Sequence, residues 1–348
     1  MIKILFALLV CSSVFATPLD LEVLNIRSGI HFDYVEGQDI DSRLFGYRFR
    51  IDAEDEVTND ISMFFSASAI LETGSNEVVA SQTEFAPLET VVLNSGGIKY
   101  EPFDFIILKI GALSPREYNS PLLMTSAPVV GAQQILDLGI IYVKSLQAIP
   151  NNNRLARRVG TLENGTPALF VHTLGLKYKD YLKLEASRFS YQDLAPNIAV
   201  DSRQFGNSTN QAGGEAERFL YAFNGVNVMV DSKLPLGAFA LGVYGQYIFN
   251  EDAPEERNEG YRAGGRFFYK SLGIEGEAFK NESDTSPGFY NSKYYGHNNI
   301  EGQAIGIFRE TKVDQFNLKY YHFEPIEDNA IQFETDIVTF NWSLKYDL

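Results

Sequence analysis

The last segment of the chain constrains the fold most, because apolar and polar residues alternate along it without interruption. Val338, Phe340, Trp342, Leu344, Tyr346 and Leu348 fall on one side, and the residues between them are Thr339, Asn341, Ser343, Lys345 and Asp347. Successive side chains of a β-strand point to opposite faces. The segment is therefore predicted to be a strand with one apolar face and one polar face.

The same period of two recurs through most of the chain. It predicts fourteen strands, at 20–35, 43–54, 60–72, 89–101, 104–113, 168–178, 181–190, 217–231, 236–250, 258–270, 272–282, 300–309, 313–324 and 334–348. A further pair at 137–144 and 154–163 would raise the number to sixteen. Both numbers are even, so both place the two ends of the chain at the same end of the sheet.

The joints between these strands alternate between short and long, which favours a membrane barrel over a soluble sandwich. Beyond the first sixteen residues no apolar run reaches the roughly 18 residues of a membrane helix. Lipid offers no hydrogen-bond partners, so a sheet that crosses it must close. We expect an all-β, closed antiparallel transmembrane barrel of fourteen strands, with short periplasmic turns and long outer loops. The alternative for the last strand, an exposed sandwich edge, would normally carry a charge or proline on its exposed face.

Residues 1–16 have the pattern of a secretory signal peptide, with Lys3, an apolar run from Ile4 to Val10, and Val14-Phe15-Ala16 as cleavage site. A lipidation box at 8–11 is the alternative, although Val10 is bulky for one. The only cysteine is Cys11, so the exported chain would have no disulfide or thiol ligand. Residues 17–348 are then expected to form one barrel.

The overall charge and the few histidines exclude several functions. A formal net charge of −16 argues against nucleic acid as a partner and predicts a mild cation preference for a channel. The four histidines show no metal-binding spacing, and the chain has no Gly-x-Ser-x-Gly elbow. We therefore expect no enzyme, no cofactor and no metal, and a histidine-dependent enzyme at the barrel rim remains an alternative.

Charged residues that alternate with aromatic ones are the predicted pore lining. Facing Phe45, Tyr47 and Phe49 toward lipid sends the intervening charges inward, since an Arg or Lys on the lipid side costs roughly 2 to 4 kcal/mol at mid-bilayer. The predicted pore-lining residues are Arg48, Arg50, Asp52, Arg262, Arg266, Glu275 and Glu277. The alternative is that these charges pair to fill a small closed barrel, but fourteen strands enclose too wide a lumen for that.

The long segment 114–167 is expected to be a constriction or plug, because it is too apolar for a loop in water. Its basic cluster of Arg154, Arg157 and Arg158 is a candidate for the constriction. As alternatives, these arginines bind lipid phosphates or lie in solvent.

Two short regions resemble known families. The final strand, with Phe340, Trp342, Leu344, Tyr346 and Leu348 at alternate positions, resembles the signal by which bacterial outer-membrane barrels are recognised for assembly. Lys109-Ile110-Gly111, Pro115 and Asp137-Leu138-Gly139 are similar to a region of the phosphate-selective and related substrate-specific porins, over about forty residues of 348. That resemblance implies a trimeric sixteen-stranded channel with a basic eyelet.

The expected function is therefore that of an outer-membrane porin for passive diffusion of ions and small polar solutes. Its expected partners are outer-membrane lipids and lipopolysaccharide, the barrel assembly machinery, those solutes, and two further copies in a homotrimer. The alternative is a barrel that acts through its surface loops, 191–216 and 283–299, as an adhesin, receptor or structural anchor.

Overall fold

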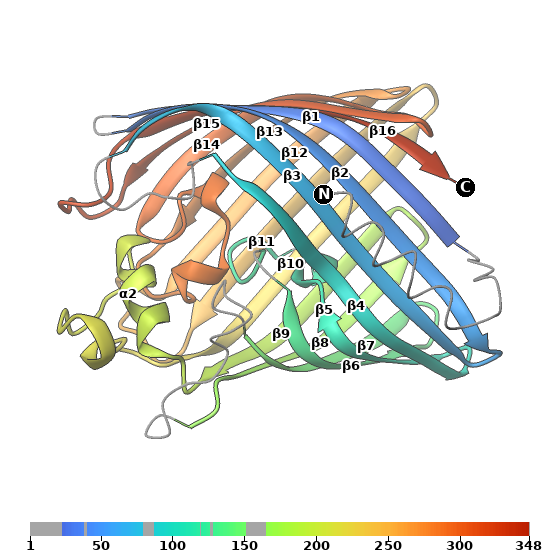
Figure 1. The fold of residues 1–348 in the computed structure, drawn as a ribbon, viewed down its shortest axis with the longest axis horizontal. Coiled ribbons are helices and arrows are strands. Elements are labelled where there is room, and N and C mark those ends of the chain that lie inside the picture. The colour runs from blue at the N-terminus through green and yellow to red at the C-terminus, as the bar shows by residue number, and fades with distance from the viewer. Residues whose placement is uncertain are drawn as a thin grey trace, which may run out of the picture.

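A computed structural model describes residues 23–37, 40–78, 87–118, 120–125, 128–150 and 165–347. The predicted signal peptide, 1–16, lies outside them. The described chain forms one closed barrel of sixteen strands in which every neighbouring pair is antiparallel (Figure 1). No helix in this part of the chain is both long and apolar enough to cross a membrane.

The strands follow one another around the barrel in chain order. Their bounds are β1 (Val23–Gly37), β2 (Ile40–Thr58), β3 (Ile61–Val78), β4 (Glu89–Phe103), β5 (Ile106–Leu113), β6 (Val129–Asp137), β7 (Ile141–Ile149), β8 (Ala168–Tyr178), β9 (Leu182–Gln192), β10 (Phe223–Leu236), β11 (Phe239–Asn250), β12 (Glu259–Tyr269), β13 (Leu272–Asn281), β14 (Ile300–Glu310), β15 (Asp314–Pro325) and β16 (Thr335–Asp347).

The barrel closes where the first strand pairs with the last. Residues Asn25 to Gly37 of β1 pair in continuous register with Asp347 to Thr335 of β16, and β1 also pairs with β2 along its whole length. On β16, Trp342 and Tyr346 are 39% and 48% exposed on the outer face, whereas Thr339 is buried on the inner one. The predicted orientation of this strand is thus present in the structure, apart from Leu348, which lies outside the described residues.

The expected number of fourteen strands is wrong, and the alternative of sixteen is right. The additional pair is β6 and β7, within the segment expected to be a long loop. Residues 137–144, considered as one strand, instead contain the turn at 138–140, in which Gly139 has a φ of +88° and donates its N–H to Asp137 Oδ1 at 2.9 Å. Residues 154–163, their suggested partner, lie outside the described residues.

Strand β6 was not predicted from the sequence, because apolar and polar residues do not alternate along it. It contains the like pairs Val129-Val130, Gln133-Gln134 and Ile135-Leu136. Part of its inner face is covered by protein rather than by water, as the bond from Gln133 Nε2 to Tyr118 Oη (2.9 Å) shows. A strand buried on its inner face in this way loses the alternation that marks a wall between lipid and water.

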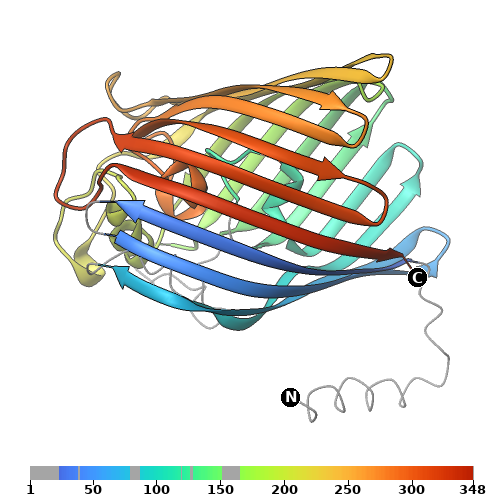
Figure 2. The same cartoon turned by 90° about the horizontal axis from the view of Figure 1, so that it is seen from above.

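The two ends of the barrel differ (Figure 2). At the end where β1 begins and β16 finishes, the joints have only two or three residues, at 59–60, 104–105, 138–140, 179–181, 237–238, 270–271 and 311–313. At the other end the joint between β1 and β2 is short, but those at 79–88, 114–128, 150–167, 193–222, 251–258, 282–299 and 326–334 are longer. The joint between β9 and β10 carries the helix α2 (Pro196–Gln204).

Two of the long connections fold into the barrel, and their described parts form much of its interior (Figure 1). We call them the β5–β6 segment (114–128) and the β13–β14 segment (282–299). In the first, Leu122, Leu123 and Met124 are at most 2% exposed, and in the second Tyr290 and Tyr295 are buried. The two segments are joined by backbone bonds from Ser292 N to Pro121 O (3.0 Å) and from Thr125 N to Tyr290 O (2.8 Å).

Candidate functional site in the barrel lumen

The seven predicted pore-lining residues all lie on the inner face, in two separate groups. Arg48, Arg50 and Asp52 lie on β2, where Phe45 and Tyr47 are exposed on the outer face. The other four lie on β13 and β12, which are separated from β2 by four and five strands, respectively, counted through β1 and β16. No prediction from sequence placed these groups relative to each other, since their positions depend on the number of intervening strands.

The group on β12 and β13 forms a charged wall with residues of the neighbouring strands. Arg266 lies 3.4 Å from Glu275 and from Asp231, and Arg262 lies 3.8 Å from Glu277. Lys319 of β15 reaches both glutamates, at 3.0 Å from Glu275 and 2.5 Å from Glu277. Its three cations thus face three carboxylates, so this wall is polar but largely self-neutralised.

Sequence reasoning missed Lys319 and Asp231. Lys319 stands between Leu318 and Tyr320, which are both 39% exposed on the outer face, and alternation alone indicates that it points inward. Its pairing with Glu277 carries no sequence signal, because the two residues belong to different hairpins and meet only through the shared neighbour β14.

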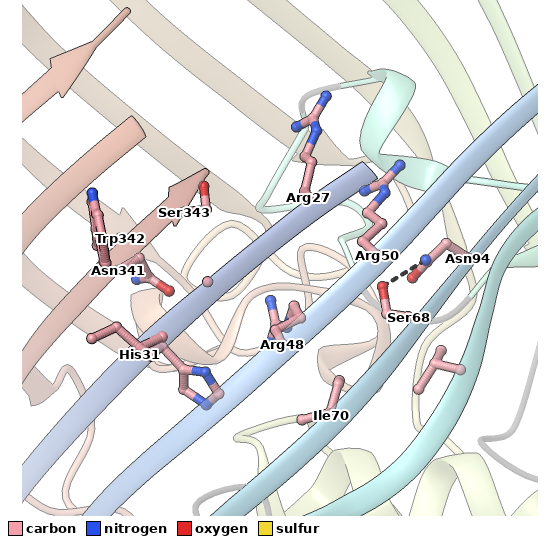
Figure 3. Close-up of a pocket in the computed structure, with 13 residues that line it drawn as sticks. Arg27, His31, Arg48, Arg50, Ser68, Ile70, Asn94, Asn341, Trp342 and Ser343 are labelled. Carbon is pink, nitrogen blue, oxygen red and sulfur yellow. Dashed lines mark hydrogen bonds between the residues drawn. The ribbon is translucent and has the colours of Figure 1, made fainter. Parts of the chain in front are cut away.

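Arg48 and Arg50 of this group line a cavity of about 250 Å³ on the inner wall formed by β1 to β4 and β16 (Figure 3). We call it the arginine pocket. Arg27 of β1 joins Arg48 and Arg50 there, and the register sets Arg27 beside Arg50 and Gly29 beside Arg48. Arg27 was not among the predicted residues, although it occupies an inward position of β1.

The three arginines differ in how their charge is compensated. Arg50 is paired with Asp52, with 2.6 Å between Nη2 and Oδ1. Arg27 and Arg48 have no carboxylate within salt-bridge distance among the residues that the structure describes, and Arg48 Nε is buried without a hydrogen-bond partner there. Within the described ranges, the pocket therefore holds two guanidinium groups without a carboxylate partner.

An extra residue in β4 completes the opposite side of the pocket. The register of β3 with β4 shifts between Ser66 and Ala67, which leaves Asn94 as a bulge. Its amide donates to Ser68 Oγ at 2.8 Å (Figure 3) and to Ser66 Oγ at 3.2 Å. Bulges of this kind redirect side chains, and here the bulge aims an amide into the lumen.

A row of three residues borders the arginine pocket. His31 of β1, Gly46 of β2 and Glu72 of β3 are register partners, and His31 Nε2 lies 2.7 Å from Glu72 Oε1. A Cβ on Gly46 would lie 2.1 Å from His31 Cε1, so only glycine leaves room for the imidazole to cross the middle strand.

The β5–β6 segment narrows the lumen from the opposite wall. Ser120 Oγ bonds to Asn227 Oδ1 (3.2 Å) and accepts from Gln246 Nε2 (2.8 Å), on the inner faces of β10 and β11. The three arginines predicted for the constriction, Arg154, Arg157 and Arg158, lie outside the described residues, so their role stays a prediction.

The β13–β14 segment narrows the lumen further, and the sequence assigned it to the surface. Tyr295 Oη lies 3.0 Å from both Arg262 Nη1 and Glu277 Oε1, so the segment is bound to the charged wall. Its Tyr294 reaches Asp33 of β1, with 3.4 Å between Oη and Oδ2. The arginine pocket is lined by residues of β1 that precede Asp33, so it lies closer than this contact to the end of the barrel with the short turns.

The histidines are bound within the fold. His172 Nδ1 lies 2.9 Å from Ser145 Oγ, and His322 Nδ1 lies 3.0 Å from Asp336 Oδ1. In the ranges that the structure describes, no three residues of the His, Cys, Asp and Glu types gather where they would hold a metal ion.

Together these features define a class of protein. A closed antiparallel barrel with an even number of strands, an oily outer face, a charged inner face and elaborated connections at one end has the architecture of transmembrane β-barrels. The folded-in segments add a narrowed lumen to it.

Comparison with solved structures gives the particular type of barrel. The chain is similar to Pseudomonas putida OprB (TM-score 0.61, 10% identity, 93% of each chain) and to Pseudomonas aeruginosa OccK5 (TM-score 0.53, 8% identity, 94% of this chain and 98% of the other). It is also similar to a triple mutant of Rhodopseudomonas blastica porin (TM-score 0.52, 10% identity, 93% and 99%). No protein-family model and no curated protein sequence matches. The chain thus shares the fold of bacterial porins.

Proposed function

We propose that the protein is an outer-membrane channel through which ions and small polar solutes diffuse passively. One observation carries this proposal: the outer face of the barrel is apolar, while its inner wall holds charged groups, including two arginines beside a cavity that have no carboxylate partner among the described residues. Buried charges without partners are costly, and Arg27 is an exposed residue of the inner wall, where water or a solute reaches it.

The path of the solute follows from what occupies the rest of the lumen. The β5–β6 segment lies against β10 and β11, and the β13–β14 segment lies against the charged wall. A cavity of about 250 Å³ lies beside β1 to β4. We therefore place the solute path along the inner faces of β1 to β4, past Arg48, Arg50 and Asp52. The charged wall, with Arg262, Arg266, Glu275 and Glu277, lies on the opposite side of this path.

The orientation and partners follow from the same architecture. The end with short turns would face the periplasm and the end with long connections the outside, as in other such barrels. Residues 1–16 would direct export, β16 would be recognised by the barrel assembly machinery, and the outer face would contact lipids and lipopolysaccharide. A homotrimer is the proposed assembly, and no catalytic role is proposed.

Conductance in planar lipid bilayers tests the channel. Purified protein should produce reproducible open-channel steps in KCl, and heat-unfolded protein should not. Absence of steps from folded protein would overturn the proposal and favour a role for the surface connections in adhesion or anchoring.

A further inference from the structure

A row of polar residues crosses the outer face of the barrel on four neighbouring strands. Gln134 of β6 is the register partner of Ser145 of β7, and the row continues through His172 of β8 to Arg188 of β9. We call these four residues the outer polar row. The next outward position toward the short turns is apolar on all four strands: Leu136, Val143, Leu174 and Ala186.

The outer polar row lies in the part of the wall that a bilayer covers. A transmembrane strand crosses the apolar core of a bilayer with about 9 to 11 residues. His172 is six residues from Tyr178, where β8 ends at a short turn, and Arg188 is six residues from Leu182, where β9 begins. Both residues are thus near the middle of the crossing, where an arginine that faces lipid is costly. Arg188 is exposed there and pairs with Glu251 at 2.6 Å.

The hydrogen-bonding groups of this face are only partly satisfied within the chain. Ser145 Oγ lies 2.9 Å from His172 Nδ1. The amides of Gln134 and of Gln147, which is the next outward residue of β7, are exposed and have no hydrogen-bond partner among the described residues. Lipid chains offer such amides no donor or acceptor, whereas the polar groups of another protein do.

The shape of the wall also changes at these strands. β5, β6 and β7 have eight, nine and nine residues, against 19 and 18 in β2 and β3. A shallow groove of about 400 Å³ lies on the outer face beside the row, lined by the apolar Leu174, Ala186 and Val226 and by His172 and Arg188. This face therefore combines an apolar depression with polar groups, as the surfaces of protein interfaces do.

The width of the row fits two further copies of this chain. In a ring of three equal barrels, each barrel touches its neighbours in two directions about 60° apart. Each of the sixteen strands takes about 22° of the circumference, so the two lines of contact are separated by about three strands. Gln134 on β6 and Arg188 on β9 have this separation. One end of the row therefore faces each neighbour.

We propose that the outer face of β6 to β9 is the surface through which three copies of this chain associate, with the Gln134 side of one copy against the Arg188 side of the next. The amide oxygen of Gln134 accepts from the guanidinium group of Arg188 in the neighbouring copy, and an apolar side chain of that copy fills the groove over Ala186. This inference rests on the proposed channel and its homotrimer, and it assigns the contact to four particular strands.

Cross-linking locates this surface. The sequence has a single cysteine, Cys11, within the predicted signal peptide, so introduced cysteines can be read without interference. Gln134→Cys and Arg188→Cys, combined in one chain, are separated by three strands, or roughly 14 Å. A shorter bismaleimide added to native membranes should therefore join copies rather than positions of one chain, and covalent dimers and trimers should appear on denaturing gels.

A matched pair on another side of the barrel is the control. Phe267 of β12 and Leu318 of β15 are exposed outward and lie three strands apart in one register row. Phe267→Cys and Leu318→Cys, combined in one chain, should leave the protein monomeric on the same gels.

Removing the polar groups should weaken the association. Gln134→Leu combined with Gln147→Leu should raise the dissociation constant of the trimer about tenfold or more, as measured by sedimentation in detergent. Gln303→Leu changes an exposed amide on the outer face of β14 and should leave that constant unchanged. Open-channel steps in KCl are recorded from the same proteins, which separates loss of association from loss of the channel.

Three results would overturn the proposal. The full chain could be monomeric both in detergent and in lipid nanodiscs, with lipid bound in the groove. The two cysteine pairs could cross-link equally. The Gln134 and Arg188 positions could cross-link only to a protein of different mass, which would assign this face to another partner.

Discussion

The imidazole of His31 crosses a neighbouring strand to bind Glu72, with 2.7 Å between Nε2 and Oε1. Gly46 lies beneath the ring, and three strands are tied together by one row of residues. The row lies beside the arginine pocket, so its integrity bears on the wall from which Arg48 projects.

The first prediction concerns this glycine. Gly46→Ala should lower the free energy of unfolding in lipid vesicles by about 2 kcal/mol, because the new methyl group displaces His31 and breaks its bond to Glu72. Urea titration followed by tyrosine and tryptophan fluorescence measures it. Gly265→Ala is the control, since a Cβ there would have nothing closer than 3.8 Å, and its effect should stay within about 0.5 kcal/mol. Equal losses would contradict the packing described for Gly46.

The second prediction concerns the charged wall. Lys319→Met should destabilise the barrel by about 3 kcal/mol, because it leaves Glu275 and Glu277 short of a cation where the Glu277 side chain has no exposed surface. Arg43→Met is the matched control, since Arg43 and Asp41 are 58% and 45% exposed and such exposed pairs contribute little to stability. The same urea titration compares the two, and a Lys319 effect no larger than that of Arg43 would refute a stabilising wall.

The third prediction concerns pH and the connection between β13 and β14. Burial raises the pKa of Asp284, whose Oδ1 accepts from Ser208 N at 2.9 Å while Oδ2 has no partner among the described residues. A raised pKa means that the stability from this group is fully present below its unfolded value of 3.8 and is lost as pH rises through the folded value.

Asp284→Asn removes this titration. The variant should therefore exceed the wild type in thermal stability at neutral pH, and the gap should close as pH falls toward 4. Melting curves of both proteins in detergent between pH 4 and 8 provide the measurement. Parallel curves over that range would mean that Asp284 is ionised without penalty.

The fourth prediction concerns the β5–β6 segment. Gln246→Ala removes bonds to Ser120 (2.8 Å) and Asn227 (2.7 Å), so the segment should loosen and the single-channel conductance should rise with more current noise. Gln303→Ala on the exposed face of β14 should leave the conductance unchanged. A fall in conductance would place the segment outside the solute path.

The fifth prediction concerns ion selectivity. Exposed charges act over a Debye length of about 8 Å at physiological salt, so charges beside the solute path count for more than the net charge of −16. Arg48→Gln should shift the reversal potential in a KCl gradient toward cation selectivity, and Arg188→Gln should not. A shift in the opposite direction would contradict the path along β2.

The alternation of side chains explains which parts were predictable. The inward positions of Arg48 and Glu277 follow from strand periodicity alone, because their neighbours must face lipid. Strand β6 could not be found in this way, since the β5–β6 segment covers part of its inner face. The partners of Glu277 and the inward fold of 282–299 depend on contacts between strands far apart in sequence. The alternation of residues within one strand does not predict such contacts.

The pairing of β1 with β16 has a consequence for biogenesis. Asn25 pairs with Asp347, so the barrel cannot close before β16 has been synthesised. A chain that lacks β16 has two unpaired sheet edges. Loss of a dozen C-terminal residues should thus not yield a slightly smaller pore. It should yield an open sheet prone to aggregation and proteolysis.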